Sequence, residues 1–293
     1  MSFSLFVNFT ERCHGALEVG FYRGKCRFTD VESIVRAAVT SKFFSDPTIA
    51  PALIRMQFHD FFVNGCDASI LLDGDSSEKT APPNLSVRGY KVIDAAKHAS
   101  GGERYNVEIG RRDGFESLAK NVRLPPGNIT VSQSIALFAE KGLDVTDMVY
   151  LLSIYGHTIG VAHCFLFQDR LYNYKNTRKP DPSMDLSLLH TLRRCCPQNS
   201  GDLNVVTLDQ NLRSAPFVDN SYYKQIQFHR GILQIDQDLA LDSLTKATVD
   251  AIAGGYDFNS KFGEAMVKLG AVQVLTGNQG EIRKSCRAVN KRY

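Results

Sequence analysis

The sequence predicts an all-α protein of one domain with minor β structure. Apolar residues recur at helical spacing through most of the chain, and many of these segments begin with a capping residue and end at glycine. Runs that alternate apolar and polar residues are short and few, Tyr105 to Ile109 being the best. A chain of 293 residues is long enough to bury a sizeable core. We expect a single domain over residues 16–293, preceded by a segment 1–15 to which no role is assigned.

The first helices are predicted from their starts. Asp30 is suited to cap a helix that carries Val31, Ile34 and Val35 on one side. Asp46-Pro47-Thr48 opens the next helix, which continues to Phe62. Further helices are expected at 90–99, 132–142, 146–155, 184–194, 220–229, 246–253 and 260–269.

Between the second and third helices, the segment from Val63 to Arg88 is rich in Gly, Asp, Ser, Asn and Pro, which predicts a long ordered loop. Loops of this length usually carry function.

Charge and apolar patterning narrow the class of partner. Lys and Arg number 34 against 31 Asp and Glu, a net charge of +3 that is scattered along the chain. This balance gives no support for nucleic acid or a membrane surface as partner, so we expect a small molecule. No apolar run approaches the roughly 18 residues of a membrane span, and the first residues lack the basic start of a convincing secretory signal.

The seven cysteines are an odd number, which leaves at least one thiol without an internal partner. No Cys-x-x-Cys pair is present, so a zinc ribbon or a thioredoxin-like motif is not expected. The cysteines stand at positions 13, 26, 66, 164, 195, 196 and 286.

Arg55 and His59 lie four residues apart in an apolar run, which places both on one face of a helix. An imidazole takes and returns a proton near neutral pH, whereas the guanidinium stays charged. The pair therefore suits a reaction in which one oxygen loses a proton while another gains negative charge, as in the cleavage of peroxide.

The residues after His59 predict a calcium site. Asp60, Asp67 and the Ser69 hydroxyl would be side-chain ligands, and the carbonyls of Val63 and Gly65 would complete the shell. The alternative interpretation is a solvated acidic turn.

A second imidazole, His157, stands between Gly156 and Gly160 directly after a strongly apolar helix. Flanking glycines allow a flat group to approach closely, so His157 is a candidate ligand of haem iron. The alternative is a hydrogen-bonded core histidine.

Taken together, these motifs resemble those of the secretory plant peroxidases, the class III haem peroxidases, over residues 20–290. The resemblance implies the haem-peroxidase-like helical fold, with haem b between a distal half (about 16–130) and a proximal half (about 131–293). The matching motifs are Arg55 to Leu72, Glu78-Lys79, Pro83-Asn84, Val87 to Tyr90, Gly110 to Asp113, Gly156 to Gly160, Asp169 to Tyr172, Asp219 to Tyr223, Asp236-Gln237 and Gly280 to Arg283.

The resemblance implies a role for each matching position. His157 would bind iron, with Asp236 accepting its other ring proton and making the imidazole more electron-donating. His59 would be the distal base, oriented by the side-chain oxygen of Asn84. Arg55 would stabilise the negative charge that develops as the O–O bond breaks.

Further ligands and partners follow from the same resemblance. Pro125 would line the site for phenolic donors, and Glu78 would join the distal calcium site. A second, proximal calcium site would comprise Thr158, Asp209, Ser214 and Asp219. The resemblance also implies hydrogen peroxide as substrate, two calcium ions, a monomer without nucleic-acid or membrane partners, and a secreted, extracellular or vacuolar location.

The chain departs from the family pattern between Ala99 and Arg104, where about two dozen residues are absent. The missing stretch would hold an apolar helix and the cysteine partners of Cys26 and Cys286. Phe61 replaces the cysteine that would pair with Cys66. Of the four family disulfides, only Cys164–Cys196 is expected.

Two alternatives to a working peroxidase remain. The first is a catalytically impaired or inactive peroxidase-like remnant. The second is a metal-dependent phosphohydrolase built on His59-Asp60, for which His98, His157, His190 and His229 would be available as ligands.

Overall fold

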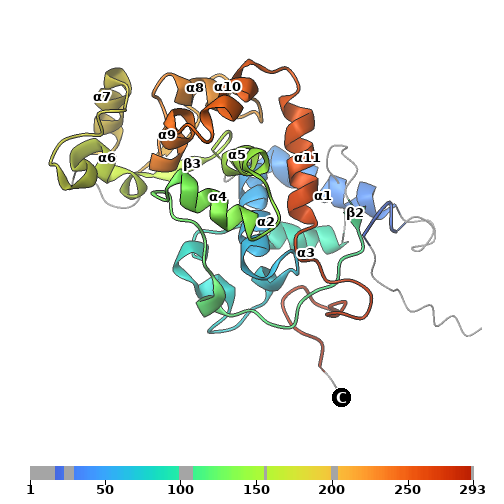
Figure 1. Cartoon of the computed structure of the whole chain (residues 1–293). Helices are drawn as coiled ribbons and strands as arrows, with labels where there is room; N and C mark the ends of the chain where they lie inside the picture. The colour runs from blue at the N-terminus through green and yellow to red at the C-terminus, as the bar shows by residue number, and fades with distance from the viewer. Residues whose placement is uncertain (1–16, 23–29, 99–107, 155–156, 199–203, 292–293) are drawn as a thin grey trace, which may run out of the picture.

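The computed structural model describes residues 17–22, 30–98, 108–154, 157–198 and 204–291. Within these ranges the protein is mostly helical, with little strand, which confirms the predicted fold class (Figure 1). The helices of the first half are α1 Val31–Ser45, α2 Ile49–Asn64, α3 Tyr90–His98, α4 Val131–Ala139 and α5 Val145–Ile154. Those of the second half are α6 Gln168–Tyr172, α7 Leu186–Cys195, α8 Ser221–Gln227, α9 Gln234–Leu241, α10 Lys246–Gly254 and α11 Phe258–Gly270.

Two short antiparallel ribbons join segments that are far apart in the sequence. β1 (Glu18–Val19) pairs with β2 (Glu108–Ile109), and β3 (Val161–His163) pairs with β4 (Val205–Thr207). The strand expected at Tyr105 to Ile109 is confirmed for its last two residues, while 105–107 lie outside the described residues.

Helices α1 and α4 begin where side-chain oxygens satisfy their free amide groups. Asp30 caps α1 by accepting the amide of Ser33 at 3.1 Å. Thr130 and Gln133 form a reciprocal capping box at the start of α4, which therefore begins at Val131, one residue before the predicted Ser132. Helices α6 and α9 were not predicted from the sequence, and they are only five and eight residues long.

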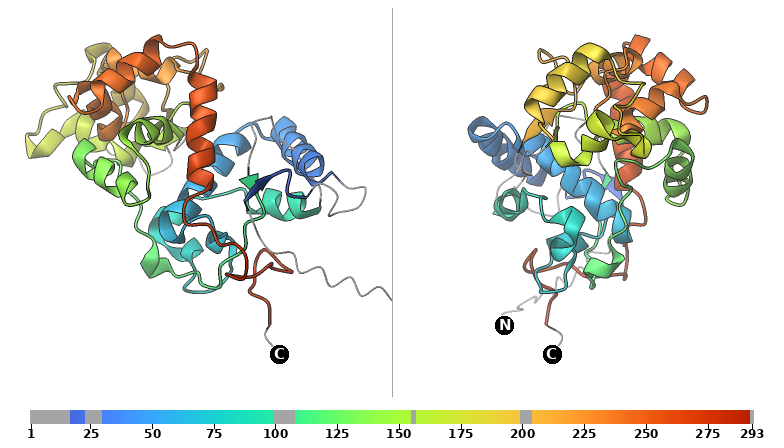
Figure 2. Two further views of the ribbon diagram at one scale, coloured as in Figure 1. Left: turned by 45° about the vertical axis from the view of Figure 1, so that its right-hand side comes forward. Right: turned by 90° about the vertical axis from the view of Figure 1, so that its left-hand side faces the viewer.

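The main core lies between α2, α5 and α11 and extends to the C-terminal helices (Figures 1 and 2). Phe58 and Phe61 are fully buried on α2, where they stack against each other edge to face, and the ring of Phe62 packs against Phe138 of α4. These aromatic contacts pack α2 against α4 and so fix the helix that carries His59.

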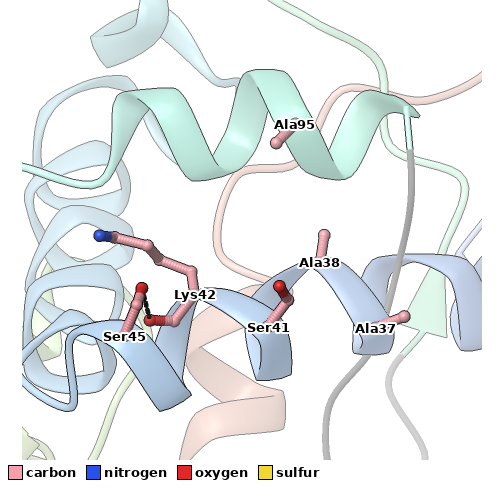
Figure 3. A pocket seen from close by; sticks show the side chains of 6 residues that line it. All are labelled: Ala37, Ala38, Ser41, Lys42, Ser45 and Ala95. Atoms are coloured by element: carbon pink, nitrogen blue, oxygen red, sulfur yellow. Dashed lines mark hydrogen bonds between the residues drawn. The ribbon is translucent and has the colours of Figure 1, made fainter.

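Helix α1 packs against α3 and has no buried residue, although it carries the predicted apolar side. Val35 and Phe44 are 41% and 82% exposed. Figure 2 shows α1, α3 and the β1–β2 ribbon on one side of the molecule. A shallow pocket between the two helices is lined by Ala37, Ala38, Ser41, Lys42, Ser45 and Ala95 (Figure 3).

Cys164 and Cys196 form the expected disulfide. Cys66 is a buried free thiol, as the phenylalanine at position 61 predicts. Cys195 and Cys286 are also free, while Cys13 and Cys26 lie outside the described residues. Among the described helices, none combines the length and apolarity needed to cross a lipid bilayer.

Candidate active site

His59 is positioned by α2 and by a 3₁₀ helix at Pro82–Asn84. Its Nδ1 lies 2.6 Å from the side-chain oxygen of Asn84, and both residues are 2% exposed. The amide group of Asn84 donates to the carbonyl of Glu78 at 2.8 Å, which leaves the Asn84 oxygen facing the imidazole. Nδ1 is therefore the protonated ring nitrogen, and Nε2 is the basic one.

Arg55 lies one helical turn before His59, as predicted from their spacing. Its guanidinium donates to the carbonyl of Pro83 at 3.0 Å and to the hydroxyl of Ser86 at 3.1 Å. Burial and the positive charge of Arg55 lower the pKa of His59 to about 4. The imidazole is thus neutral, and able to accept a proton, at any pH well above 4.

The loop after α2 gathers the acidic residues that the sequence analysis assigned to calcium. The Asp60 carboxylate accepts the amides of Ala68 and Ile70 at 3.0 and 3.2 Å, and Asp67 accepts the amide of Ser69 at 3.0 Å. Ser69 and Glu78 are fully buried, and their side-chain oxygens have no hydrogen-bond partner among the described residues. Buried oxygens without partners are costly unless a cation or water satisfies them.

Burial and neighbouring negative charge disfavour the ionised forms of two carboxyl groups in this loop. Loss of solvation and the nearby Asp67 raise the pKa of Asp60 to about 8. Burial, with a further contribution from Asp67, raises the pKa of Glu78 to about 7. Within the described residues, no group of three or more His, Cys, Asp and Glu side chains is arranged as a complete metal site. A shell here would need the Ser69 hydroxyl and backbone carbonyls in addition to carboxylates.

His157 follows α5 and is 5% exposed. Its Nδ1 lies 2.7 Å from Oδ1 of Asp236, a fully buried carboxylate in the first turn of α9. Burial alone would raise the pKa of Asp236, but His157 and the amide of Leu233 hold it below its ordinary value. Asp236 therefore accepts the Nδ1 proton as a carboxylate, which makes Nε2 the basic nitrogen of the ring.

Tyr222 completes this cluster and was not identified from the sequence. Its hydroxyl donates to Oδ1 of Asp236 at 3.0 Å, and its ring lies edge-on to the imidazole of His157. The motif Asp219 to Tyr223 indicated this segment, but a tyrosine in an apolar helix is most simply interpreted as core. Its contacts with Asp236 and with the ring of His157 connect Tyr222 to the site.

The four residues assigned to a proximal calcium site lie in two neighbouring segments. The hydroxyl of Ser214 donates to Asp209 at 2.7 Å, and burial, together with the charge of Asp219, raises the pKa of Asp209. The amide of Leu208 donates to the carbonyl of Gly160 at 3.0 Å, which brings the segment of Thr158 beside that of Asp209. Thr158 is 2% exposed.

Other sequence assignments are placed as follows. Pro125 is half-buried in the connection before α4. Of the histidines proposed for a phosphohydrolase, the side chain of His98 lies outside the described residues. The others do not gather with His59-Asp60 into a metal cluster within the described part of the chain. His190 is exposed on α7, and Nδ1 of His229 bonds the carbonyl of Ser183.

Comparison with known proteins agrees with this geometry. A family model described as "Peroxidase" matches residues 35–100 and 95–255. The two matched segments meet at residues 95–100, where the sequence lacks part of the family pattern.

The chain is also similar to several named plant proteins. It is 47% identical to "Peroxidase 60" of Arabidopsis thaliana, with 96% of this chain and 92% of the relative covered. It is 43% identical to "Peroxidase 44" of the same plant, with 98% and 97% covered. It is 39% identical to "Peroxidase N1" of Nicotiana tabacum, with 93% and 90% covered.

These matches favour neither the inactive remnant nor the phosphohydrolase. They extend over nearly the whole chain and include both histidines, His59 on α2 and His157 after α5. The chain belongs to the peroxidase family and is a plant peroxidase.

Proposed function

We propose that this peroxidase uses haem b, with His157 as the iron ligand and His59 as the distal base, to reduce hydrogen peroxide. One observation carries the proposal. Two buried imidazoles, in separate halves of the chain, each direct Nδ1 to an oxygen acceptor held by another segment, at 2.6 Å in His59–Asn84 and 2.7 Å in His157–Asp236. In both rings Nδ1 is therefore the protonated nitrogen, which makes Nε2 the basic one.

The donor set supports haem. A neutral imidazole whose Nδ1 bonds a buried carboxylate is a strong ligand for haem iron, and Asp236 and Tyr222 hold that carboxylate in place. Haem bound through His157 would supply the redox chemistry of peroxide reduction. The protein residues would then provide orientation, proton transfer and charge stabilisation.

On the distal side, His59 would move the proton. Nε2 would accept the proton from one oxygen of peroxide and return it to the other oxygen, which then leaves as water. Asn84 would keep the ring in the required tautomer. Arg55 would stabilise the negative charge that develops while the O–O bond breaks, because its guanidinium stays charged at every working pH.

We further propose calcium at both predicted sites. The distal site would use Asp60, Asp67 and Ser69, with the carbonyls of Val63 and Gly65, and Glu78 nearby. Support comes from the buried Ser69 hydroxyl and Glu78 carboxylate, which have no hydrogen-bond partner among the described residues. The raised pKa values of Asp60 and Glu78 support it as well. The proximal site would use the four oxygen-bearing residues Thr158, Asp209, Ser214 and Asp219.

The donor substrates are proposed to be small phenols that reach the haem edge near Pro125. We also propose that the protein acts as a monomer outside the cytosol. Membership of the plant peroxidases and the Cys164–Cys196 disulfide support this location, because disulfides persist in oxidising compartments.

The test is reconstitution of the purified protein with haemin and calcium. We expect an intense Soret band that is lost in His157→Ala and kept in His190→Ala, in which an exposed histidine is removed. Peroxide-dependent oxidation of a simple phenol should accompany the band. A spectrum of free haemin from the folded wild-type protein would contradict the proposal.

A further inference from the structure

Arg170 is the most deeply buried charged group near the proximal histidine without a direct role in the proposed mechanism. It lies on α6 and is 1% exposed. Its Nε donates to Oδ2 of Asp181 at 2.8 Å, and Nη1 donates to three consecutive carbonyls. These carbonyls belong to Gly231, Ile232 and Leu233, at 2.7, 2.8 and 2.9 Å.

The charge of Arg170 is balanced inside the protein. Burial would raise the pKa of Asp181, but Ser183 and Arg170 together keep it below its ordinary value. Ser183 donates to Oδ1 of Asp181 through its amide at 2.8 Å and its hydroxyl at 2.7 Å. Asp181 is therefore a carboxylate bonded through both oxygens, which fixes the direction in which the guanidinium presents Nη1.

The segment that Arg170 holds leads directly into the start of α9. The peptide unit between Ile232 and Leu233 is bonded at both ends: its carbonyl accepts from Arg170 at 2.8 Å, and its amide donates to Oδ2 of Asp236 at 2.9 Å. Because a peptide unit is planar, fixing the carbonyl also fixes the direction of the amide. The other oxygen of Asp236 bonds Nδ1 of His157 at 2.7 Å.

Gly231 shows how closely this segment packs against α9. Its amide donates to Oε1 of Gln237 at 3.1 Å. A Cβ added at Gly231 would lie 2.9 Å from the backbone nitrogen of Gln237 and 3.2 Å from Cβ of Asp236. The segment therefore has little freedom to move without moving Asp236.

We propose that Arg170 is a positioning residue for the proximal imidazole, acting through the Ile232–Leu233 peptide and Asp236. The inference rests on the proposed role of His157 as iron ligand. In this chain of contacts the guanidinium polarises the peptide, the amide holds Oδ2 of Asp236, and Oδ1 is aimed at Nδ1 of His157. Arg170 thereby sets both the tautomer and the orientation of His157 without a direct role in the proposed chemistry.

The experiment uses the full-length protein without haem, so that it does not depend on cofactor binding. The Nδ1 proton of His157 is observed by NMR in protein labelled with ¹⁵N-histidine and identified by its loss in Asp236→Asn. In Arg170→Lys, which keeps the charge but cannot span three carbonyls and Asp181, we expect its exchange with water to rise about tenfold or more.

Arg283→Lys is the matched control. Arg283 is 6% exposed and donates to the carbonyls of Ala68 and Gly114 at 2.7 and 2.6 Å, neither of which belongs to the segment that leads into α9. Arg283→Lys also removes buried hydrogen bonds from a guanidinium to backbone carbonyls, and it should leave the His157 signal unchanged. A purely structural role for Arg170 would make the two variants equivalent in this measurement, and that result would overturn the proposal.

Two further measurements keep the test decisive if Arg170→Lys does not fold. Gly231→Ala displaces the same segment from the side of α9 and should perturb the His157 proton without touching Arg170. In the wild-type protein, the Leu233 amide should be protected from exchange with water, because it donates to Oδ2 of Asp236. A freely exchanging amide would contradict the proposal. A protected amide in a protein that fails to bind haem would instead overturn the proposed function alone.

Discussion

His59 and Asn84 form a buried hydrogen bond of 2.6 Å between residues that are 25 positions apart. The Asn84 amide is anchored in turn on the carbonyl of Glu78, within the loop assigned to distal calcium. The orientation of the His59 imidazole is therefore linked to the packing of that loop. Substitutions at Asn84 or in that loop should therefore alter the orientation of the imidazole.

Asn84→Leu removes the acceptor from Nδ1 of His59 while keeping an apolar volume of similar size. We expect the rate of reaction with peroxide to fall by about 10- to 100-fold, since the ring loses its tautomer and orientation. Stopped-flow measurement of the reconstituted enzyme tests this expectation. Asn121→Leu, at a partly exposed asparagine in another 3₁₀ helix, is the control and should keep the wild-type rate.

His59→Leu should lower the same rate by about 10² to 10⁴-fold if His59 moves the proton. The lowered pKa of His59, about 4, predicts the pH dependence. Because His59 is neutral above its pKa, the rate at which the wild-type enzyme reacts with peroxide should be flat from about pH 5 to 8. It should fall as the pH drops through about 4. A wild-type rate that falls already below pH 6.5 would mean that the imidazole is not shielded as the structure indicates.

The stability of the folded protein should follow the same titration. A histidine whose folded pKa is lowered contributes stability above its unfolded pKa of about 6.5, and this contribution is lost as the pH falls through about 4. Urea unfolding at pH 7, 5.5 and 4 should show a steeper loss of free energy in the wild-type protein than in His59→Leu. Equal slopes would contradict the assignment.

Calcium should stabilise the protein more at pH 8 than at pH 5. A carboxyl whose folded pKa is raised destabilises the fold progressively as the pH rises from its unfolded value through its folded value, here about 8 for Asp60 and about 7 for Glu78. A bound cation removes this cost and releases the protons. Thermal unfolding with calcium or a chelator at the two pH values measures the difference.

Glu78→Gln tests which group carries that effect. Both carboxylate oxygens of Glu78 are buried without a partner, so a neutral amide should make the calcium-free protein at pH 8 as stable as the wild type or more stable. The stabilisation by calcium should shrink. Glu140→Gln changes an exposed glutamate at the end of α4 and should leave both quantities unchanged.

The Cys164–Cys196 disulfide closes a segment with a sequence separation of 32 that includes Arg170 and Asp181. Replacing both cysteines with serine should lower the free energy of unfolding by about 2 to 4 kcal/mol, the usual effect of such a loop. Cys195→Ser, at the exposed neighbouring thiol, should change it by less than about 0.5 kcal/mol. Chemical unfolding under non-reducing conditions provides the comparison.

The exposure of α1 predicts that a substitution on its surface changes the free energy of unfolding much less than a substitution in the core. Phe44 is 82% exposed, so Phe44→Ser should shift the free energy of unfolding by less than about 0.5 kcal/mol. Phe138 is fully buried, and Phe138→Ala should cost about 3 to 5 kcal/mol. A large cost for Phe44→Ser would show that α1 packs against a layer that the described residues lack.

Most long helices could be predicted from the sequence because their signals are local. Asp30 caps α1, and the apolar periodicity of α2 and α5 extends over more than two turns. Helix α9 was missed because eight residues, with Asp236 and Gln237 buried among apolar neighbours, give no clear amphipathic pattern. The ribbon of β3 and β4 was missed because three-residue strands carry almost no periodic signal.

The sequence by itself determined the fold class, the spacing of Arg55 and His59 on one helix, the acidic loop that follows them, and the family to which these motifs belong. Only the tertiary structure decided that Asn84 orients His59, that Tyr222 and Leu233 hold Asp236, and that Arg170 reaches the same carboxylate through a peptide. The reason is physical. Caps and helical periodicity are interactions between near neighbours, whereas a buried hydrogen bond joins residues from distant segments and is specified by how the whole core packs.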